Sequence, residues 1–144
     1  AYMMTGSHHL YNYLPTKHEK WLTMIKQEII DSGLIVDILN AKTMEDVFRL
    51  LQGCSFLGSF LAYQYTIDMN YSPYINFSEN DFVKAGIGAI RGIKKCFLCY
   101  GNKCEDAIWY VKEHFNDLQK RYGYTSFHPL LGHEPTLIDC RIVL

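Results

Sequence analysis

Two helix-capping boxes constrain the fold more than any other feature of this sequence. Thr16 stands three residues before Glu19, and Thr43 stands three residues before Asp46. In a capping box, the threonine hydroxyl and the acidic side chain each accept a hydrogen bond from a backbone N–H group that the first helical turn leaves unpaired. We therefore predict that one helix begins after Thr16 and another after Thr43.

Apolar residues recur at helical spacing behind both boxes and again in the last third of the chain. They predict a helix that ends at Gly33, a second that ends at Gly53, and a long amphipathic helix over residues 103–121. The pattern is carried by Trp21, Ile25 and Ile29, by Val47, Leu50 and Leu51, and by Ile108, Val111, Phe115 and Leu118.

Shorter patterns complete an all-helical prediction. Residues 57–64 open a further apolar helix, residues 70–78 are typical of an irregular loop, and Ser78 with Asp81 predicts another helix start. Residues 86–95 predict a basic helix behind a glycine turn, and the tail is expected to end as a short strand or helix on the core. The predicted fold class is all-α, a compact helical bundle.

Length and composition favour one domain. The chain has 144 residues, of which 49% are hydrophobic, so one core can be buried without metal or disulfide support. The chain opens at Ala1 rather than Met, which suggests a domain of a longer parent protein. We therefore expect residues 1–144 to form a single helical domain.

Charge and hydropathy limit the classes of partner. The formal net charge of -1 excludes a uniformly basic nucleic-acid coat and an acidic tail, so any phosphate contact must come from a local patch. No apolar run is long enough to span a membrane, and no signal peptide is recognisable. We expect an intracellular protein, nuclear if the source is eukaryotic, with no membrane partner.

The five cysteines do not predict a disulfide framework, because their number is odd and the expected compartment is reducing. Cys96, Cys99 and Cys104, with His114 or Cys140 as a fourth donor, have only part of a zinc-site spacing. No second CxxC pair follows, so we assign no metal.

The glycine run Gly86-x-Gly88-x-x-x-Gly92 resembles a phosphate loop only superficially. No strand precedes it, and it lacks the Lys-Ser/Thr ending of a P-loop. We therefore predict neither a nucleotide cofactor nor a self-contained kinase. Arg91, Lys94 and Lys95 behind these glycines could still contact phosphate groups, or they could form a solvated helical face.

Gly53 and Gly58 predict a tight hairpin between two helices. Such a hairpin exposes backbone N–H groups at the start of the second helix, which is how helix-hairpin-helix modules hold a DNA phosphate. The alternative is that both glycines only allow the helices to pack closely.

Three polar residues are candidates for chemistry on a base. Gln64 and Asp68 share one face of the helix behind this hairpin, where an amide and a carboxylate one turn apart can contact a base edge or position a water. Asp81 follows Gly58 by 23 residues at the expected start of the next helix. The alternatives are solvated or capping roles and, for Asp81, a helix-dipole contact.

Taken together, these positions resemble the helical domain of 5-hydroxymethyluracil DNA kinases and of the related alpha-glutamyl/putrescinyl thymine pyrophosphorylases. The order and spacing of the pieces agree over most of residues 1–97. The pieces are Ala1-Tyr2, Thr5-Gly6, Leu57-Gly58-x-Phe60-Leu61-Ala62-x-Gln64, Asp68 with Tyr71, Asp81, and Gly86-x-Gly88-Ala89-x-x-Gly92-Ile93.

The resemblance implies a DNA-glycosylase-like, helix-hairpin-helix fold that takes part in thymine hypermodification in DNA. Under this first hypothesis, Gly58, Gly86, Gly88, Arg91 and Lys94 bind DNA, while a companion kinase domain or protein subunit supplies any phosphoryl transfer. Gln64 would contact a base, and Asp68 or Asp81 would act as base or orient the reacting group. If the domain is active, it is a base-modifying transferase or kinase-associated domain.

The second hypothesis is a catalytically silent subunit that docks a protein partner in a nucleic-acid-modifying complex through aromatic residues. Near-neutral charge favours it, as do two departures from the family pattern: Ile87 in place of proline, and the stop soon after Ile138-Asp139-Cys140. The presence of Gln64, Asp68 and Asp81 favours the first hypothesis.

Overall fold

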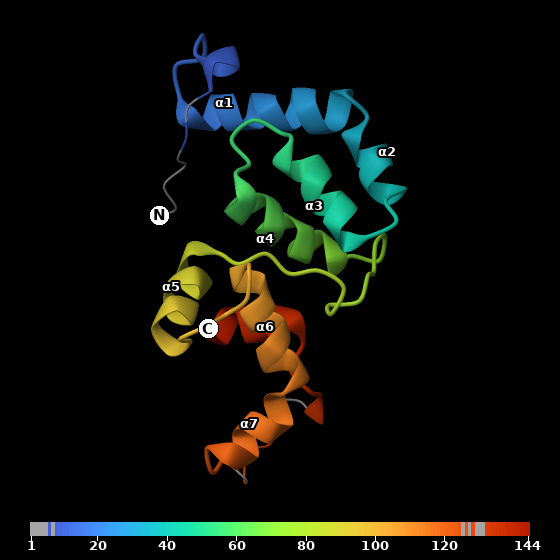
Figure 1. The fold of residues 1–144 in the computed structure, drawn as a ribbon. Coiled ribbons are helices and arrows are strands. Elements are labelled where there is room, and N and C mark those ends of the chain that lie inside the picture. Colours follow the sequence, from blue (N-terminus) through green and yellow to red (C-terminus); the bar gives the residue numbers. More distant parts are fainter. Residues whose placement is uncertain (1–5, 7, 125, 127, 129–131) are drawn as a thin grey trace. The chain divides into compact units, whose positions relative to one another are not determined.

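The structure is a computed structural model that describes residues 6, 8–124, 126, 128 and 132–144 (Figure 1). Every regular element in these residues is a helix, which confirms the all-α prediction. The chain packs as two compact units, unit 1 (Ala1–Phe77) and unit 2 (Ser78–Leu144). Each unit has its own buried core.

Unit 1 is built from short helices around one buried cluster. Its elements are η1 (His9–Tyr11), α1 (Lys17–Met24), η2 (Ile25–Asp31), α2 (Leu34–Leu39), α3 (Met44–Gln52) and α4 (Ser59–Asn70). Its largest fully buried side chains are Met24, Ile38, Met44, Val47, Tyr63 and Thr66. α3 and α4 pack against each other, and Phe48 and Tyr63 meet there edge to face.

Both predicted capping boxes are present. Thr16 accepts from the Glu19 N–H group, and the Glu19 carboxylate accepts from the Thr16 N–H group. Thr43 and Asp46 make the same reciprocal pair at the start of α3. These local bonds explain why α1 and α3 begin where the sequence predicts.

The first helix departs from α-geometry before it ends. Residues Ile25–Asp31 form a π-helix, η2, which continues α1 as one rod (Figure 1). The rod stops at Gly33, whose φ of 82° lies in the left-handed region that side chains other than glycine rarely adopt. The predicted end at Gly33 is therefore confirmed.

Unit 2 comprises α5 (Ile87–Cys96), α6 (Cys104–Glu113), α7 (Phe115–Arg121) and α8 (Leu137–Val143). The last helix begins with a third capping box, formed by Thr136 and Asp139, and packs on α6 and α5. The tail therefore ends as a helix rather than a strand. The buried residues of this unit are Val83, Ala85, Ala89, Ile93, Ala107, Ile108, Leu137, Ile138, Cys140 and Arg141.

The predicted helix start at Ser78 and Asp81 is wrong. Residues 78–81 form a single turn, in which Ser78 Oγ accepts from the Asn80 N–H group at 3.2 Å and the Ser78 carbonyl accepts from the Asp81 N–H group at 3.0 Å. Side-chain bonds of this kind compete with helix formation. Glu79 and Asn80 are also engaged elsewhere, because they accept from Thr136 Oγ1 and from the Leu137 N–H group at the start of α8.

The predicted long helix over residues 103–121 is broken in two. His114 lies between α6 and α7 with φ -106° and ψ 15°, outside helical values. Its ring stacks on Tyr110, and its Nδ1 lies 2.9 Å from the Tyr110 carbonyl oxygen. The Tyr110 carbonyl is thus shared between the backbone N–H group and the side chain of His114. The chain changes direction at this residue.

Candidate nucleic-acid interface

The candidate residues of unit 1 all belong to α4. Gly58 is its N-cap, with extended backbone angles of φ -69° and ψ 170°. Gln64 is half-buried, and Asp68 is exposed one turn further along. The shared helical face that the spacing predicts is therefore present.

Close helix packing does not require a glycine at position 58. A Cβ atom built there would meet nothing within 4 Å, whereas one at Gly53 would lie 3.3 Å from the Leu50 carbonyl oxygen. Gly58, Ser59 and Phe60 are exposed. The start of α4 is thus an accessible helix N-terminus, where unpaired N–H groups and the helix dipole favour an anion.

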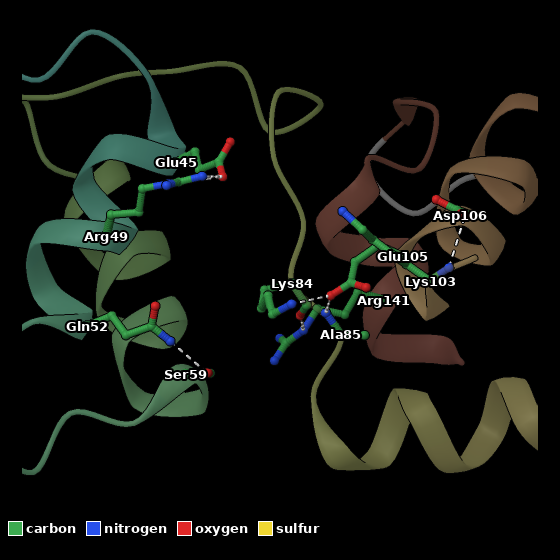
Figure 2. A network of polar contacts seen from close by, with 10 residues as sticks. All are labelled: Glu45, Arg49, Gln52, Ser59, Lys84, Ala85, Lys103, Glu105, Asp106 and Arg141. Atoms are coloured by element: carbon green, nitrogen blue, oxygen red, sulfur yellow. Dashed lines mark hydrogen bonds and ion pairs between the residues drawn. The ribbon is translucent and has the colours of Figure 1, made fainter. Parts of the chain in front are cut away.

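Side-chain hydrogen bonds hold the connection between α3 and α4. Gln52 Nε2 at the end of α3 donates to Ser59 Oγ in the first turn of α4 at 2.8 Å (Figure 2). Within the connection, the Ser55 N–H group donates to Glu28 Oε2 at 2.7 Å. One bond therefore joins the two helices that flank the connection, and the other joins the connection to the π-helix.

Glu28 also accepts a 2.5 Å hydrogen bond from the Tyr11 hydroxyl. Burial acts to raise the pKa of Glu28, but the bonds from Tyr11 and Ser55 outweigh burial and hold that pKa below its ordinary value. Burial, followed by the bond to Glu28, raises the pKa of Tyr11. The Glu28 carboxylate is therefore ionised, and its hydrogen bonds stabilise the fold of unit 1.

Phe56, within the same connection, has a left-handed backbone with φ 65°. A bulky residue adopts this conformation only where its surroundings favour it. The Phe56 ring stacks on Trp21 and contacts Tyr11, with ring centroids 5.5 Å apart in both pairs. Aromatic packing thus fixes the shape of the hairpin.

In unit 2, an extended segment over residues 82–86 leads into α5. Glu105 Oε1 on α6 accepts from Lys84 Nζ at 2.8 Å and from the Ala85 N–H group at 3.0 Å. Arg141 on α8, which is buried, donates from Nε to the Lys84 carbonyl at 2.8 Å. Figure 2 shows these groups converging on the segment, so α6 and α8 both position the start of α5.

The electrostatics of Glu105 follow from this anchoring. Burial acts to raise the pKa of Glu105, but the bonds from Lys84 and Ala85 outweigh it and lower the pKa. The ionised carboxylate therefore pairs with Lys84. That pairing leaves Lys84 less suited to bind phosphate than the cations of α5.

α5 presents one apolar face and one basic face. Ala89 and Ile93 are buried, while Arg91, Lys94 and Lys95 are exposed at helical spacing of three and four residues. Gly86 is the N-cap of this helix. The sequence prediction of a basic helix behind a glycine turn is confirmed.

The glycines of α5 have different surroundings. Gly88 is exposed, and a Cβ atom there would meet nothing within 4 Å. A Cβ atom on Gly92 would clash with the backbone carbonyl of Leu144. Gly92 thus serves packing within unit 2, whereas Gly88 leaves the first turn of α5 open to solvent.

Charge is segregated around this helix. Residues 82–104 hold five of the fourteen Lys and Arg residues and none of the fifteen Asp and Glu residues. The chain has a formal net charge of -1, so the remaining residues are net acidic. Three of the five cations, Arg91, Lys94 and Lys95, lie on α5, so a local basic patch is present on this helix.

The structure groups the sequence candidates into three sets. Gly58, Gln64 and Asp68 share α4 of unit 1, whereas Gly86, Gly88, Arg91 and Lys94 share the α5 region of unit 2. Asp81 is exposed in the turn that precedes the extended segment. The catalytic roles of Gln64, Asp68 and Asp81 stay predictions.

Sequence reasoning missed the residues that hold these elements. Glu28, Glu105 and Arg141 bond to backbone groups of segments 20 to 57 residues away in the chain. No local pattern marks such contacts. The Thr136-x-x-Asp139 box could have been found, because its spacing matches that of the two boxes that were predicted.

The five cysteines are free thiols, with Cys54 and Cys140 buried. Among the described residues, no group of three or more His, Cys, Asp or Glu side chains could hold a metal ion. Within the same part of the chain, no helix combines the length and the apolar character needed to cross a membrane.

Comparison with known proteins places this chain in a family. The family model described as the 5-hmdU DNA kinase, helical domain, matches residues 1–144. No curated protein and no solved structure matches the chain. The motif pieces Ala1-Tyr2 and Thr5 lie outside the described residues, but the match extends over them. The resemblance inferred from the sequence is thereby confirmed, and the chain belongs to the family of 5-hmdU DNA kinase helical domains.

Proposed function

We propose that this chain is the DNA-contacting helical module of an enzyme that hypermodifies thymine or 5-hydroxymethyluracil in DNA. The observation that carries the proposal is the basic face of α5, with exposed Arg91, Lys94 and Lys95 in a stretch without acidic residues. Phosphate contacts dominate DNA affinity and need such a face. The family name implies a DNA substrate and a companion kinase domain, to which we assign phosphoryl transfer.

The α3–α4 hairpin offers a second phosphate contact, in the manner of a helix-hairpin-helix, glycosylase-like module. Gly58 leaves the α4 N-terminus open, and the bonds from Gln52 and to Glu28 hold the connection in place. A preorganised hairpin loses little conformational entropy on binding a phosphate. Its backbone N–H groups offer a phosphate contact that belongs to unit 1 alone.

Gln64, Asp68 and Asp81 are the proposed contacts to the reacting nucleotide. Gln64 contacts a base edge through its amide, and Asp68 or Asp81 acts as base or orients the reacting group. The exposure of Asp68 and Asp81 supports access to a ligand. This assignment is separable from phosphate binding, because it concerns chemistry rather than affinity.

Removing α5 cations tests the phosphate contact. We expect the Arg91→Ala/Lys94→Ala variant to bind short single- and double-stranded DNA at least tenfold more weakly than the unchanged chain, as measured by fluorescence anisotropy. The matched control is Lys120→Ala/Arg121→Ala on α7, which removes two exposed cations from the same unit. Equal losses in both variants would show general charge attraction rather than a contact at α5.

A separate assay addresses the catalytic assignment. In the parent protein acting on DNA that contains 5-hydroxymethyluracil, Gln64→Ala and Asp81→Asn are expected to abolish modification. The melting temperature should stay within a few degrees, since neither side chain belongs to the buried core. Unchanged modification in both variants would remove the catalytic assignment and leave DNA binding untouched.

One observation favours docking to a protein partner as a second candidate function. Segment 22–39 of unit 1 exposes large aliphatic side chains, namely Leu22, Ile30, Ile35, Val36 and Leu39. Exposed apolar side chains that form a contiguous patch are typical of interaction sites. If the chain is a silent subunit, Ile30→Ser and Val36→Ser should abolish its complex with the companion kinase domain in size-exclusion chromatography; an unchanged complex contradicts this function.

A further inference from the structure

A hollow opens in unit 2 directly behind the basic helix. Its volume is about 420 Å³, and it is lined by Phe97, Cys99, Tyr100, Gly101, Asp106, Ala107 and Tyr110. Three of these seven residues are aromatic. The walls come from the loop that follows α5 and from the first turns of α6.

The loop wall of this hollow is shaped by Asp106. One oxygen, Asp106 Oδ2, accepts from the N–H groups of Asn102 at 2.9 Å and Lys103 at 3.0 Å; Figure 2 shows the contact with Lys103. Gly101 has φ 81°, and a Cβ atom there would lie 2.5 Å from Asp106 Oδ2, so only glycine lets the loop wrap so closely. The hollow is therefore built by specific contacts.

The helix wall carries a ring that is held in place. Tyr110 stacks on His114 with ring centroids 4.3 Å apart and an interplanar angle of 25°. His114 is in turn bound to the Tyr110 carbonyl through Nδ1. Tyr110 is 45% exposed, so an ordered aromatic surface remains accessible to a ligand.

Leu98 projects from the same loop and is fully exposed. It lies between two residues that line the hollow, Phe97 and Cys99, and three residues after Lys95 of α5. A fully exposed leucine gains nothing from folding. Proteins that deform DNA insert apolar side chains of this kind between base steps.

We propose that this hollow receives a DNA base displaced from its stack, while Leu98 fills the gap left in the duplex. The inference rests on the proposed function, because it requires DNA on the basic face of α5. Charge complementarity argues for a DNA ligand, since Arg91, Lys94 and Lys95 are exposed on the helix that leads into the loop wall of the hollow. Tyr100 and Tyr110 offer rings on which any base can stack.

Asp106 adds a polar contact suited to a base. A carboxylate has about four lone-pair sites, and the two hydrogen bonds to Oδ2 leave acceptor capacity for an N–H group on the pairing edge of a base. Extruding a base costs least where the base is already mismatched. A protein with this hollow therefore favours duplexes with a weakened pair.

The test compares three duplexes of one sequence: fully paired, with a single central thymine–thymine mismatch, and with abasic sites in place of both mismatched thymines. The full chain should bind the mismatched duplex about tenfold more tightly than the paired one, the contribution of one stacked base. The abasic duplex should lose most of that preference, because it has no base to place in the hollow.

Variants locate the effect. Tyr110→Leu and Leu98→Ala should each reduce the mismatch preference to less than about threefold, whereas Tyr122→Leu, an exposed tyrosine outside the hollow, should keep it. Leu98 is fully exposed, so its variant cannot act by unfolding the chain. Equal, salt-sensitive affinity for all three duplexes overturns the base hollow while the proposed DNA-binding function stands. Failure to bind any duplex overturns both.

Discussion

At the residue scale, Glu28 joins three segments of unit 1 that are distant in the sequence. Tyr11 lies 17 residues before it and Ser55 lies 27 residues after it, and both donate to its carboxylate. Such partners offset the cost of withdrawing a partly buried carboxylate from water. One carboxylate therefore sets the position of the N-terminal turn and of the α3–α4 hairpin.

Replacing this carboxylate by an amide should expose its contribution. We expect Glu28→Gln to lower the free energy of unfolding by about 1–2 kcal/mol at pH 7, because both charge-assisted bonds are weakened. The pKa of Glu28 is depressed in the folded state, so its stabilisation is present above the ordinary value of 4.5 and is lost as pH falls through the lower folded value. Urea unfolding followed from pH 7 to pH 3 measures this, and a difference that stays constant over that range would refute it.

A substitution at Gly88 can distinguish an effect on helix stability from an effect on DNA binding. Alanine has a higher helix propensity than glycine, and a Cβ atom on Gly88, in the first turn of α5, meets open space. Gly88→Ala should therefore raise the free energy of unfolding by about 0.5–1 kcal/mol. If a phosphate approaches the first turn of α5 closely, the same variant should bind DNA more weakly; a stabilised variant with unchanged affinity would remove Gly88 from the interface.

At the element scale, local patterns were predicted and distant partnerships were not. The Thr16 and Thr43 boxes and the Gly33 stop depend on neighbours within a turn, so the sequence alone located α1 and α3. The turn at 78–81 depends on Thr136 and Leu137, which are 57 residues away from their partners. A helix start was therefore predicted at residues 78–81, where the side chains of Glu79 and Asn80 instead bind the start of α8.

Two predicted helices differ from the structure because their helical geometry changes along the chain. The π-helix Ile25–Asp31 has more residues per turn than an α-helix, so the α-helical spacing that begins at Trp21 is not kept beyond Met24. Trp21 is buried, but Ile25 is exposed. A period of 3.6 residues cannot anticipate such a shift, nor the break at His114.

The anchoring of α5 can be tested through Glu105. We expect Glu105→Ala to lower the free energy of unfolding by about 1–3 kcal/mol, because it leaves the Ala85 N–H group and Lys84 without their acceptor. Amide hydrogen exchange should then rise at residues 82–90 and stay unchanged in α3. Unaltered protection at residues 82–90 would show that α5 is positioned without this carboxylate.

At the scale of the whole molecule, composition excluded classes of partner but did not locate the basic surface. The net charge of -1 hides the cationic stretch on α5, which became evident as a surface only when Ala89 and Ile93 were found buried and Arg91 and Lys94 exposed. The family was accessible from the order of glycines and polar residues. The hollow beside Tyr110 was not, because its lining comes from a loop and a helix that no spacing rule connects.

The two units give the molecule two separate spectroscopic reporters. Trp21 is buried in unit 1, and Trp109 is partly exposed in unit 2. In a Trp109→Phe background, Glu28→Gln should shift the Trp21 unfolding transition more than Glu105→Ala does, because each unit has its own core. Equal shifts from both substitutions would mean that the units unfold as one.

The central claim is that α5 contacts DNA phosphates, and the dependence of affinity on salt tests it most directly. Plotting log affinity for a short duplex against log salt concentration gives a slope of about 0.9 per neutralised phosphate. We predict that the magnitude of this slope falls by about 2 in Arg91→Ala/Lys94→Ala and stays unchanged in Lys120→Ala/Arg121→Ala. A slope that is the same in both variants and in the unchanged chain would contradict it.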